Sequence, residues 1–154
     1  MVTQESSESK LTNLNSPIFS AALRQAGISA SLTSIAPLVP EASTRRYYRL
    51  SFADGSTLVG VHEDPATART NMLLVAEIQS FLKAGGVAVP EIVFVDAEAG
   101  IMLQQDLGDQ SLNAALREKN DQADGLYQQA IEHMFRWQRL GNDGKCPAFG
   151  LSFD

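Results

Sequence analysis

The sequence has only one cysteine, Cys146, among 154 residues. A single cysteine cannot form a disulfide within the chain, and a metal site built on thiolates needs several of them. Cysteine usage therefore favours a reducing, cytoplasmic setting and predicts no thiolate metal site. We interpret Cys146 as incidental to function.

Long apolar runs are also missing. No stretch approaches the eighteen or so apolar residues that a membrane-spanning helix needs. Residues 1–15 are rich in Ser, Thr, Glu and Asn, without the apolar core of a secretory signal. We expect this segment to be a flexible leader, and we expect no membrane partner.

Basic residues are outnumbered, with 12 Lys and Arg against 18 Asp and Glu, for a net charge of -6. No segment concentrates positive charge enough to neutralise a run of phosphates, so nucleic acid is not an expected partner. The chain is 44% hydrophobic and 19% charged, which is typical of an ordinary globular protein. Its length suits one domain with its own core.

Apolar periodicity and turn residues predict an order of elements. Ser16 and Pro17 begin a helix that Gly27 ends. A second helix is expected over residues 65–84, where apolar side chains recur at steps of three and four. Strands are expected at residues 32–39, 46–52, 57–61, 89–95 and 101–105, and further helices at residues 111–118 and 122–140. The pattern predicts an α+β fold with an antiparallel sheet of about five strands and one packed helix.

A first candidate binding segment lies at residues 40–50, before and within the second expected strand. A triphosphate is held by backbone amides of a tight turn, supported by hydroxyl groups and a nearby guanidinium. Ser43, Thr44, Arg45 and Arg46 have the residue types for that role. They could equally form an ordinary turn followed by alternating residues of a β-ribbon.

A second candidate segment lies at residues 104–109, with the sequence Gln-Gln-Asp-Leu-Gly-Asp. It joins an expected strand to an expected helix. From the residues alone it could be a plain loop, with Asp109 or Ser111 as the helix cap.

Together these segments and the order of elements resemble the aminoglycoside phosphotransferase superfamily, which is kinase-like, and within it the branch of amino-sugar and cell-wall sugar kinases. The resemblance covers residues 38–112. It rests on Glu-Ala-Ser at 41–43, Arg-Arg-Tyr-Tyr at 45–48, Val-Pro at 89–90 and Asp-Leu-Gly-Asp at 106–109.

The resemblance implies a protein-kinase-like N-lobe with its N-terminal helix over residues 16–107. It implies a hinge and the first helices of a truncated C-lobe over residues 108–154. ATP is the implied cofactor, with Mg²⁺ bound by ligands outside this chain. The phosphates would lie at residues 43–46, and adenine at Gln105, Asp106 and Leu107, through the carbonyl of Gln105 and the amide of Leu107.

Catalytic and metal-binding residues are not predicted. Kinase-like folds place a phosphate-binding Lys on the third strand, where this sequence has His62, although relatives in the amino-sugar branch also tend to lack that Lys. The family's catalytic loop carries His-x-Asp with a later Asn. Residues 62–64 read His-Glu-Asp but have Arg69 at the Asn position, and His133 is not followed by the pattern.

Two functions follow as alternatives. In the first, the chain is the ATP-binding lobe of a kinase that phosphorylates a hydroxyl of an amino sugar or related sugar, inactive alone. In the second, it is a non-catalytic regulatory or interaction module that retains the fold. The apolar face of residues 126–140 predicts self-association in either case.

Overall fold

The computed structural model describes residues 11–14, 17–39, 45–118, 122–141 and 145–147. The chain divides into two compact units, which we name by their content. The sheet unit comprises residues 1–73 and 91–106, and the helical unit comprises residues 74–90 and 107–154.

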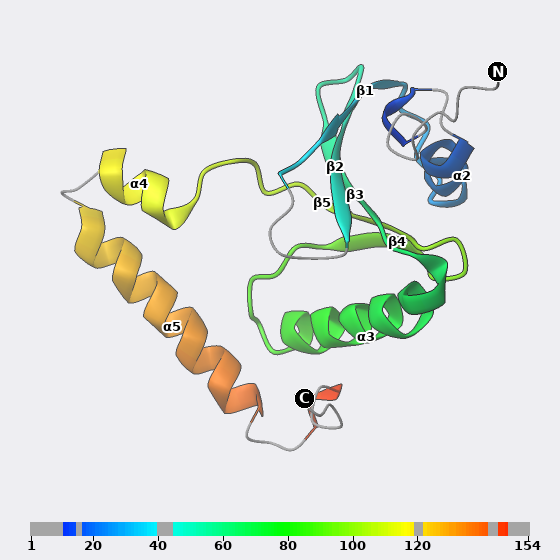
Figure 1. Cartoon of the computed structure of the whole chain (residues 1–154). Coiled ribbons are helices and arrows are strands. Elements are labelled where there is room, and N and C mark those ends of the chain that lie inside the picture. Colours follow the sequence, from blue (N-terminus) through cyan, green and yellow to red (C-terminus); the bar gives the residue numbers. More distant parts are fainter. Residues whose placement is uncertain (1–10, 15–16, 40–44, 119–121, 142–144, 148–154) are drawn as a thin grey trace. The chain divides into compact units, whose positions relative to one another are not determined.

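Five antiparallel strands form the sheet, in the order β1-β2-β3-β5-β4 (Figure 1). Their bounds are β1 Leu32–Pro37, β2 Arg46–Phe52, β3 Thr57–His62, β4 Ile92–Asp96 and β5 Ile101–Gln105. The helices are α2 Pro17–Gln25, α3 Pro65–Ala84, α4 Leu112–Glu118 and α5 Ala123–Gly141. The predicted α+β class and the five-stranded antiparallel sheet are confirmed.

Cross-strand register assigns the side chains to two faces. Directly paired residues in an antiparallel ladder point to the same side of the sheet. Tyr48 pairs with Gly60, which pairs with Leu103, so these three share one face. The next residues along each strand, including Tyr47 and Val61, share the other face.

The Tyr48 face carries the main hydrophobic core, together with α2. The core consists of buried residues from α2 and the three strands β1, β2 and β5, with Leu11 before the helix: Leu11, Phe19, Ala22, Leu23, Ile35, Tyr48, Leu50, Phe52, Ile101 and Leu103. The Phe19 ring meets Tyr48 edge-on at 5.5 Å between centroids. A Cβ at Gly60 would lie 2.5 Å from the Phe19 ring, so glycine leaves room for the aromatic side chain.

The Tyr47 face has a second apolar layer. Val59, Val61 and Met102 are buried on it. Ala68 and Met72, in the part of α3 that belongs to the sheet unit, are completely buried. The sheet is therefore apolar on both faces near its centre.

The fourth strand begins at Ile92, three residues later than expected, because Pro90 has no N–H for the ladder and its carbonyl accepts a hydrogen bond from Gln79 at 3.1 Å. Of the predicted leader, residues 1–10 and 15 lie outside the described residues. Leu11 is 3% exposed and contributes to the core.

The helical unit pairs the end of α3 with α5. The Leu140 side chain occupies the space where a Cβ at Gly85 would project. Arg136 Nη1 donates to the carbonyl oxygen of Gly86 at 2.7 Å. Large apolar side chains along α5 remain exposed, namely Tyr127, Ile131, Met134, Phe135 and Trp137. Self-association through residues 126–140 stays a prediction.

Candidate functional site

The seven residues predicted to bind nucleotide fall in three places. Ser43 and Thr44 lie outside the described residues. Arg45 immediately precedes β2 and Arg46 begins it, while Gln105 ends β5. The list is completed by Asp106, in the sheet unit, and Leu107, which belongs to the helical unit and is 67% exposed.

Arg45 and Arg46 have different neighbours because successive side chains of a strand alternate between its faces. Arg46 pairs with His62 across the β2–β3 ladder. Arg45 Nε donates instead to Glu63 Oε2 at 3.0 Å. Of the two arginines, Arg45 thus lies on the Tyr47 face with a carboxylate partner.

Glu63 is the centre of a polar cluster that we call the Glu63 cluster, made of Arg45, Glu63 and Asn71. Asn71 Nδ2 donates to Glu63 Oε1 at 2.5 Å, so each carboxylate oxygen accepts from a different side chain. The Glu63 side chain is 1% exposed and that of Arg45 is 24% exposed. A buried charge with two well-placed donors satisfies the requirement for pairing in the interior.

Backbone contacts fix the position of Glu63. Its amide donates to the carbonyl of Gly100 at 2.9 Å. Gly100 has φ of 68°, a conformation that glycine adopts without a Cβ penalty. A Cβ there would collide with the carbonyl oxygen of Glu63. The turn between β4 and β5 therefore closes tightly on the end of β3.

The Glu63 carboxylate is ionised at neutral pH. Burial raises its pKa, but hydrogen bonds from Asn71, Arg45 and Thr67 outweigh the burial, and the net pKa lies below the ordinary glutamate value of 4.5. Glu63 thus provides a permanent negative charge that faces Arg45.

A second ion pair joins Arg49 and Asp106. Arg49 Nε lies 2.6 Å from Oδ2, and Nη2 lies 3.2 Å from Oδ1, which is a two-point guanidinium–carboxylate contact. The Asp106 side chain is 4% exposed. Its carboxylate holds the chain that leaves β5 against β2, a structural role that the sequence did not indicate.

Gln105 is tied to the residue before β4. Its amide donates to the Glu91 carbonyl at 2.7 Å, and its side-chain oxygen accepts from the Glu91 amide at 3.2 Å. These contacts fix the strand end on which the predicted adenine contact depends. The assignment of Gln105, Asp106 and Leu107 to adenine stays a prediction.

Three side chains of the Tyr47 face form a stripe along β2 and the residue before it. Arg45, Tyr47 and Arg49 occupy alternate positions, with Tyr47 opposite Val61 and Arg49 opposite Val59. The stripe places a guanidinium at each end and a half-buried aromatic ring in the middle. Such a surface can contact both an anion and a flat apolar group.

Sequence reasoning missed Arg49, Glu63 and Asn71. A usable signal existed for Glu63, because only four residues separate the expected strands at residues 46–52 and 57–61. A hairpin with that short connection places position 63 near position 45. The observed pairing of Arg46 with His62 follows that register. The contact from Asn71 to Glu63 depends on how α3 packs, and the contact from Arg49 to Asp106 joins residues 57 positions apart, so neither could be predicted from a local pattern.

The His-Glu-Asp sequence at residues 62–64 has other roles. His62 faces Arg46 and Ile101 across the sheet. Burial and the nearby Arg46 charge lower its pKa below 6.5, although Asp64 opposes this. Asp64 caps the N-terminus of α3, since its Oδ1 accepts from the Ala66 amide at 2.9 Å. Within the described residues, no group of three or more His, Cys, Asp or Glu side chains could hold a metal ion.

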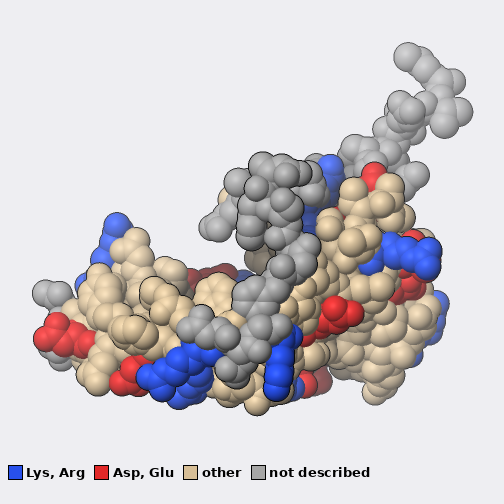
Figure 2. Space-filling view, turned by 90° about the horizontal axis from the view of Figure 1, so that it is seen from below, with Lys and Arg blue, Asp and Glu red and all other residues tan. Residues whose placement is uncertain are grey.

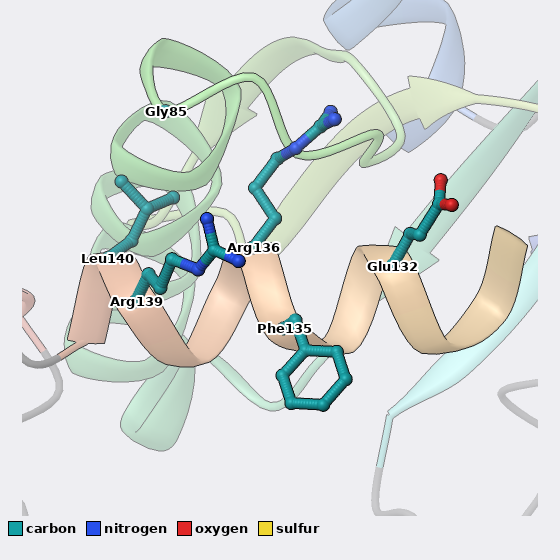
Figure 3. Close-up of a pocket in the computed structure, with 6 residues that line it drawn as sticks. All are labelled: Gly85, Glu132, Phe135, Arg136, Arg139 and Leu140. Atoms are coloured by element: carbon teal, nitrogen blue, oxygen red, sulfur yellow. The ribbon is translucent and has the colours of Figure 1, made fainter. Parts of the chain in front are cut away.

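The helical unit contains a separate cavity of about 490 Å³ (Figure 3). Its lining consists of Gly85 and side chains of α5: Glu132, Phe135, Arg136, Arg139 and Leu140. Phe135 points away from Gly85, whereas Leu140 and Arg136 extend toward the end of α3 (Figure 3). The cavity contains none of the residues predicted to bind nucleotide.

Charge is mixed over the visible surface. Figure 2 shows Lys and Arg interspersed with Asp and Glu, with no extended basic field on that face. Among the described residues, no helix has the length and apolar character to cross a membrane.

Comparison with known proteins gives one consistent relationship. No family model matches the chain. An N-acetylmuramate/N-acetylglucosamine kinase of Pseudomonas aeruginosa is 31% identical over 113 residues, and one of Pseudomonas putida is 33% identical over 109 residues. A protein of the same name from Neisseria meningitidis serogroup B is 29% identical over 111 residues.

These matches cover 71–73% of the chain but only 31–32% of each relative. The chain thus spans about a third of the length of the curated relatives it matches. The predicted relationship to sugar kinases is supported as a distant homology.

Proposed function

We propose that this chain is the nucleotide-binding lobe of an ATP-dependent kinase that phosphorylates a hydroxyl of an amino sugar. The homology to proteins named N-acetylmuramate/N-acetylglucosamine kinase carries this proposal. The five-stranded sheet agrees with a kinase-like N-lobe. ATP would supply the phosphoryl group, and the sugar would be the acceptor.

The residues of the sheet unit fit the phosphate part of ATP in chemical type. Arg45 keeps 24% of its side-chain surface in solvent while a buried carboxylate holds it. Guanidinium groups donate strong, charge-assisted hydrogen bonds to phosphate oxygens. We propose that Arg45 contacts the phosphates, together with the hydroxyl groups of Ser43 and Thr44, which the sequence predicts to bind there.

Mg²⁺ is expected to accompany ATP, but the fit of this chain to the metal is poor. The Glu63 and Asp106 carboxylates already accept hydrogen bonds from arginine. We therefore assign no metal ligand. We expect the 154 residues alone to bind nucleotide weakly and to transfer no phosphoryl group, because the sequence does not contain the family's His-x-Asp loop with a later Asn.

Calorimetric titration of the 154-residue chain with ATP in the presence of Mg²⁺ tests the proposal. We expect a dissociation constant for ATP that rises by about tenfold in Arg45→Ala, the loss of one charge-assisted hydrogen bond. Arg69→Ala is a matched control, because Arg69 pairs with Glu98 at an exposed position, 74% and 77% exposed respectively. Wild-type protein that shows no heat of binding with ATP would reject the proposed function.

A further inference from the structure

We propose that Glu63 and Asn71 are positioning residues that hold the Arg45 guanidinium in place for the phosphates of a bound nucleotide. This inference rests on the proposed function. It concerns residues that neither the sequence motifs nor the comparisons single out.

A buried ion pair contributes little net stability, because removing two charges from water offsets their attraction. An apolar residue at position 63 would fill the same interior space without that cost. The Glu63 side chain is nonetheless 1% exposed and ionised. A role beyond stability therefore accounts better for a carboxylate at this position.

The geometry of the pair identifies that role. Glu63 contacts the Nε side of Arg45, and a guanidinium has five N–H donors in a rigid plane. A carboxylate at Nε thus fixes the orientation of the whole plane. Because 24% of the Arg45 side chain is exposed, an anion can approach it from solvent.

Asn71 completes the arrangement because its side chain carries no charge. It is a neutral donor to Glu63 Oε1, so it orients the carboxylate without neutralising its charge. The negative charge of Glu63 then acts on Arg45. Glu63 itself follows β3, α3 supplies Asn71, and the β4–β5 turn supplies the Gly100 contact, so three separate elements fix the carboxylate that holds Arg45.

Arg49 provides a comparison on the same face of β2. Its Nε and Nη2 both contact Asp106, whose side chain is 4% exposed. The two arginine side chains are almost equally exposed, 24% for Arg45 and 23% for Arg49, so their place in the chain distinguishes them. Arg45 directly follows residues 43–44, which are predicted to bind phosphate. It is therefore the better candidate to contact the phosphates of a nucleotide.

Holding Arg45 in advance lowers the entropic cost of binding, because a long side chain is already ordered when the ligand arrives. The effect should be confined to ligands that carry phosphate. Adenosine, which has the same base and sugar but no phosphate, should be insensitive to the Glu63 cluster. This difference separates positioning from a general loss of structure.

The test is calorimetric titration of the full chain with ATP and with adenosine. In Glu63→Gln we expect the dissociation constant for ATP to rise about five- to tenfold, the size of one weakened charge-assisted hydrogen bond. The constant for adenosine should stay within twofold. Asn71→Ser is a milder change and should raise the dissociation constant for ATP by about two- to threefold. Glu98→Gln removes an exposed carboxylate partner of Arg69 and should change neither constant.

The double variant Arg45→Ala with Glu63→Gln distinguishes action through Arg45 from a direct or structural effect. If Glu63 acts through Arg45, Glu63→Gln adds no further loss of ATP affinity in the Arg45→Ala background. Equal losses in both backgrounds, unchanged ATP binding in Glu63→Gln, or a parallel loss of adenosine binding would overturn the inference. Wild-type protein that binds neither ligand would reject the proposed function and this inference with it. If the wild type binds both ligands, the proposed function stands, and the variants then test the role of Glu63 alone.

A second measurement needs no nucleotide. The ¹⁵Nε–H resonance of Arg45 in the NMR spectrum should be protected from exchange with water in the wild type, and it should lose that protection in Glu63→Gln. An equally protected resonance in both proteins would show that Glu63 does not hold the guanidinium.

Discussion

Arg49 donates two hydrogen bonds to Asp106, from Nε at 2.6 Å and from Nη2 at 3.2 Å. The contact joins β2 to the first residue after β5, 57 positions further along the chain. Because the Asp106 side chain is 4% exposed, removing its partner would leave a buried charge without compensation.

Arg49→Met should accordingly destabilise the protein by about 2 kcal/mol, below the full cost of breaking a buried pair because Arg49 is 23% exposed. Arg49→Lys should recover less than half of the loss, since an ammonium cannot reproduce the two-point contact. Urea unfolding followed by circular dichroism measures both changes. Arg69→Met is the control, and its exposed pair should be worth less than about 0.5 kcal/mol. A loss as small as that of the control would contradict a structural role for the Arg49–Asp106 pair.

Gly60→Ala tests the packing of α2 against the sheet. The added methyl group would lie 2.5 Å from the Phe19 ring, and Phe19 is completely buried. We expect a destabilisation of about 1–3 kcal/mol from overpacking. In the Phe19→Leu background the same change should cost less, because the shorter side chain leaves room. Additive free energies of unfolding in the double variant would show that the two residues do not compete for space.

The fold was predictable where local pattern and tertiary packing agree. Strands β2 and β5 have the predicted bounds, and α3 covers the predicted residues 65–84. The fourth strand was predicted three residues too early, because Val89 has strand propensity while the hydrogen bonding of Pro90 is decided by Gln79 in the folded chain.

The candidate site was less accessible to sequence reasoning. Residue type drew attention to Arg45 and Arg46 equally, whereas pairing across the sheet gives them different partners. Asp106 stays a predicted nucleotide contact, and its observed carboxylate partner is Arg49, which the residue types did not indicate. These contacts depend on register and on segments far apart in the chain, which no local motif encodes.

Gly100→Ala and Gly55→Ala form a matched pair that measures the closure of the β4–β5 turn on Glu63. Both glycines have positive φ, 68° and 83°. Gly55 has no atom near the position of an added Cβ, whereas at Gly100 that atom would meet the Glu63 carbonyl. We expect Gly55→Ala to lower the free energy of unfolding by about 1 kcal/mol, which is the conformational cost alone. Gly100→Ala should lower it by at least about 3 kcal/mol. Similar thermal unfolding temperatures for the two variants would contradict the tight contact.

Acid should destabilise the protein in two steps. The folded pKa of His62 lies below 6.5, through burial and the Arg46 charge, so the unfolded chain takes up this proton first as pH falls. His62 therefore contributes stability above pH 6.5 that is lost as the pH falls toward its folded pKa. The folded pKa of Glu63 lies below 4.5, despite its burial, because of its hydrogen bonds. Its contribution is complete above pH 4.5 and is lost as the pH falls through the folded pKa.

Urea unfolding between pH 3 and pH 8 measures these contributions by comparing wild type with His62→Gln and Glu63→Gln. The free-energy difference between wild type and Glu63→Gln should be constant above about pH 5.5 and should shrink below pH 4.5, where the unfolded carboxylate becomes protonated. The free energy of unfolding of the wild type should begin to decline near pH 6.5 as the pH falls, and this decline should be smaller in His62→Gln. A wild-type advantage over Glu63→Gln that grows toward low pH would mean that the folded carboxylate binds protons more readily than the unfolded one. That sign would contradict the stabilising hydrogen bonds from Arg45 and Asn71.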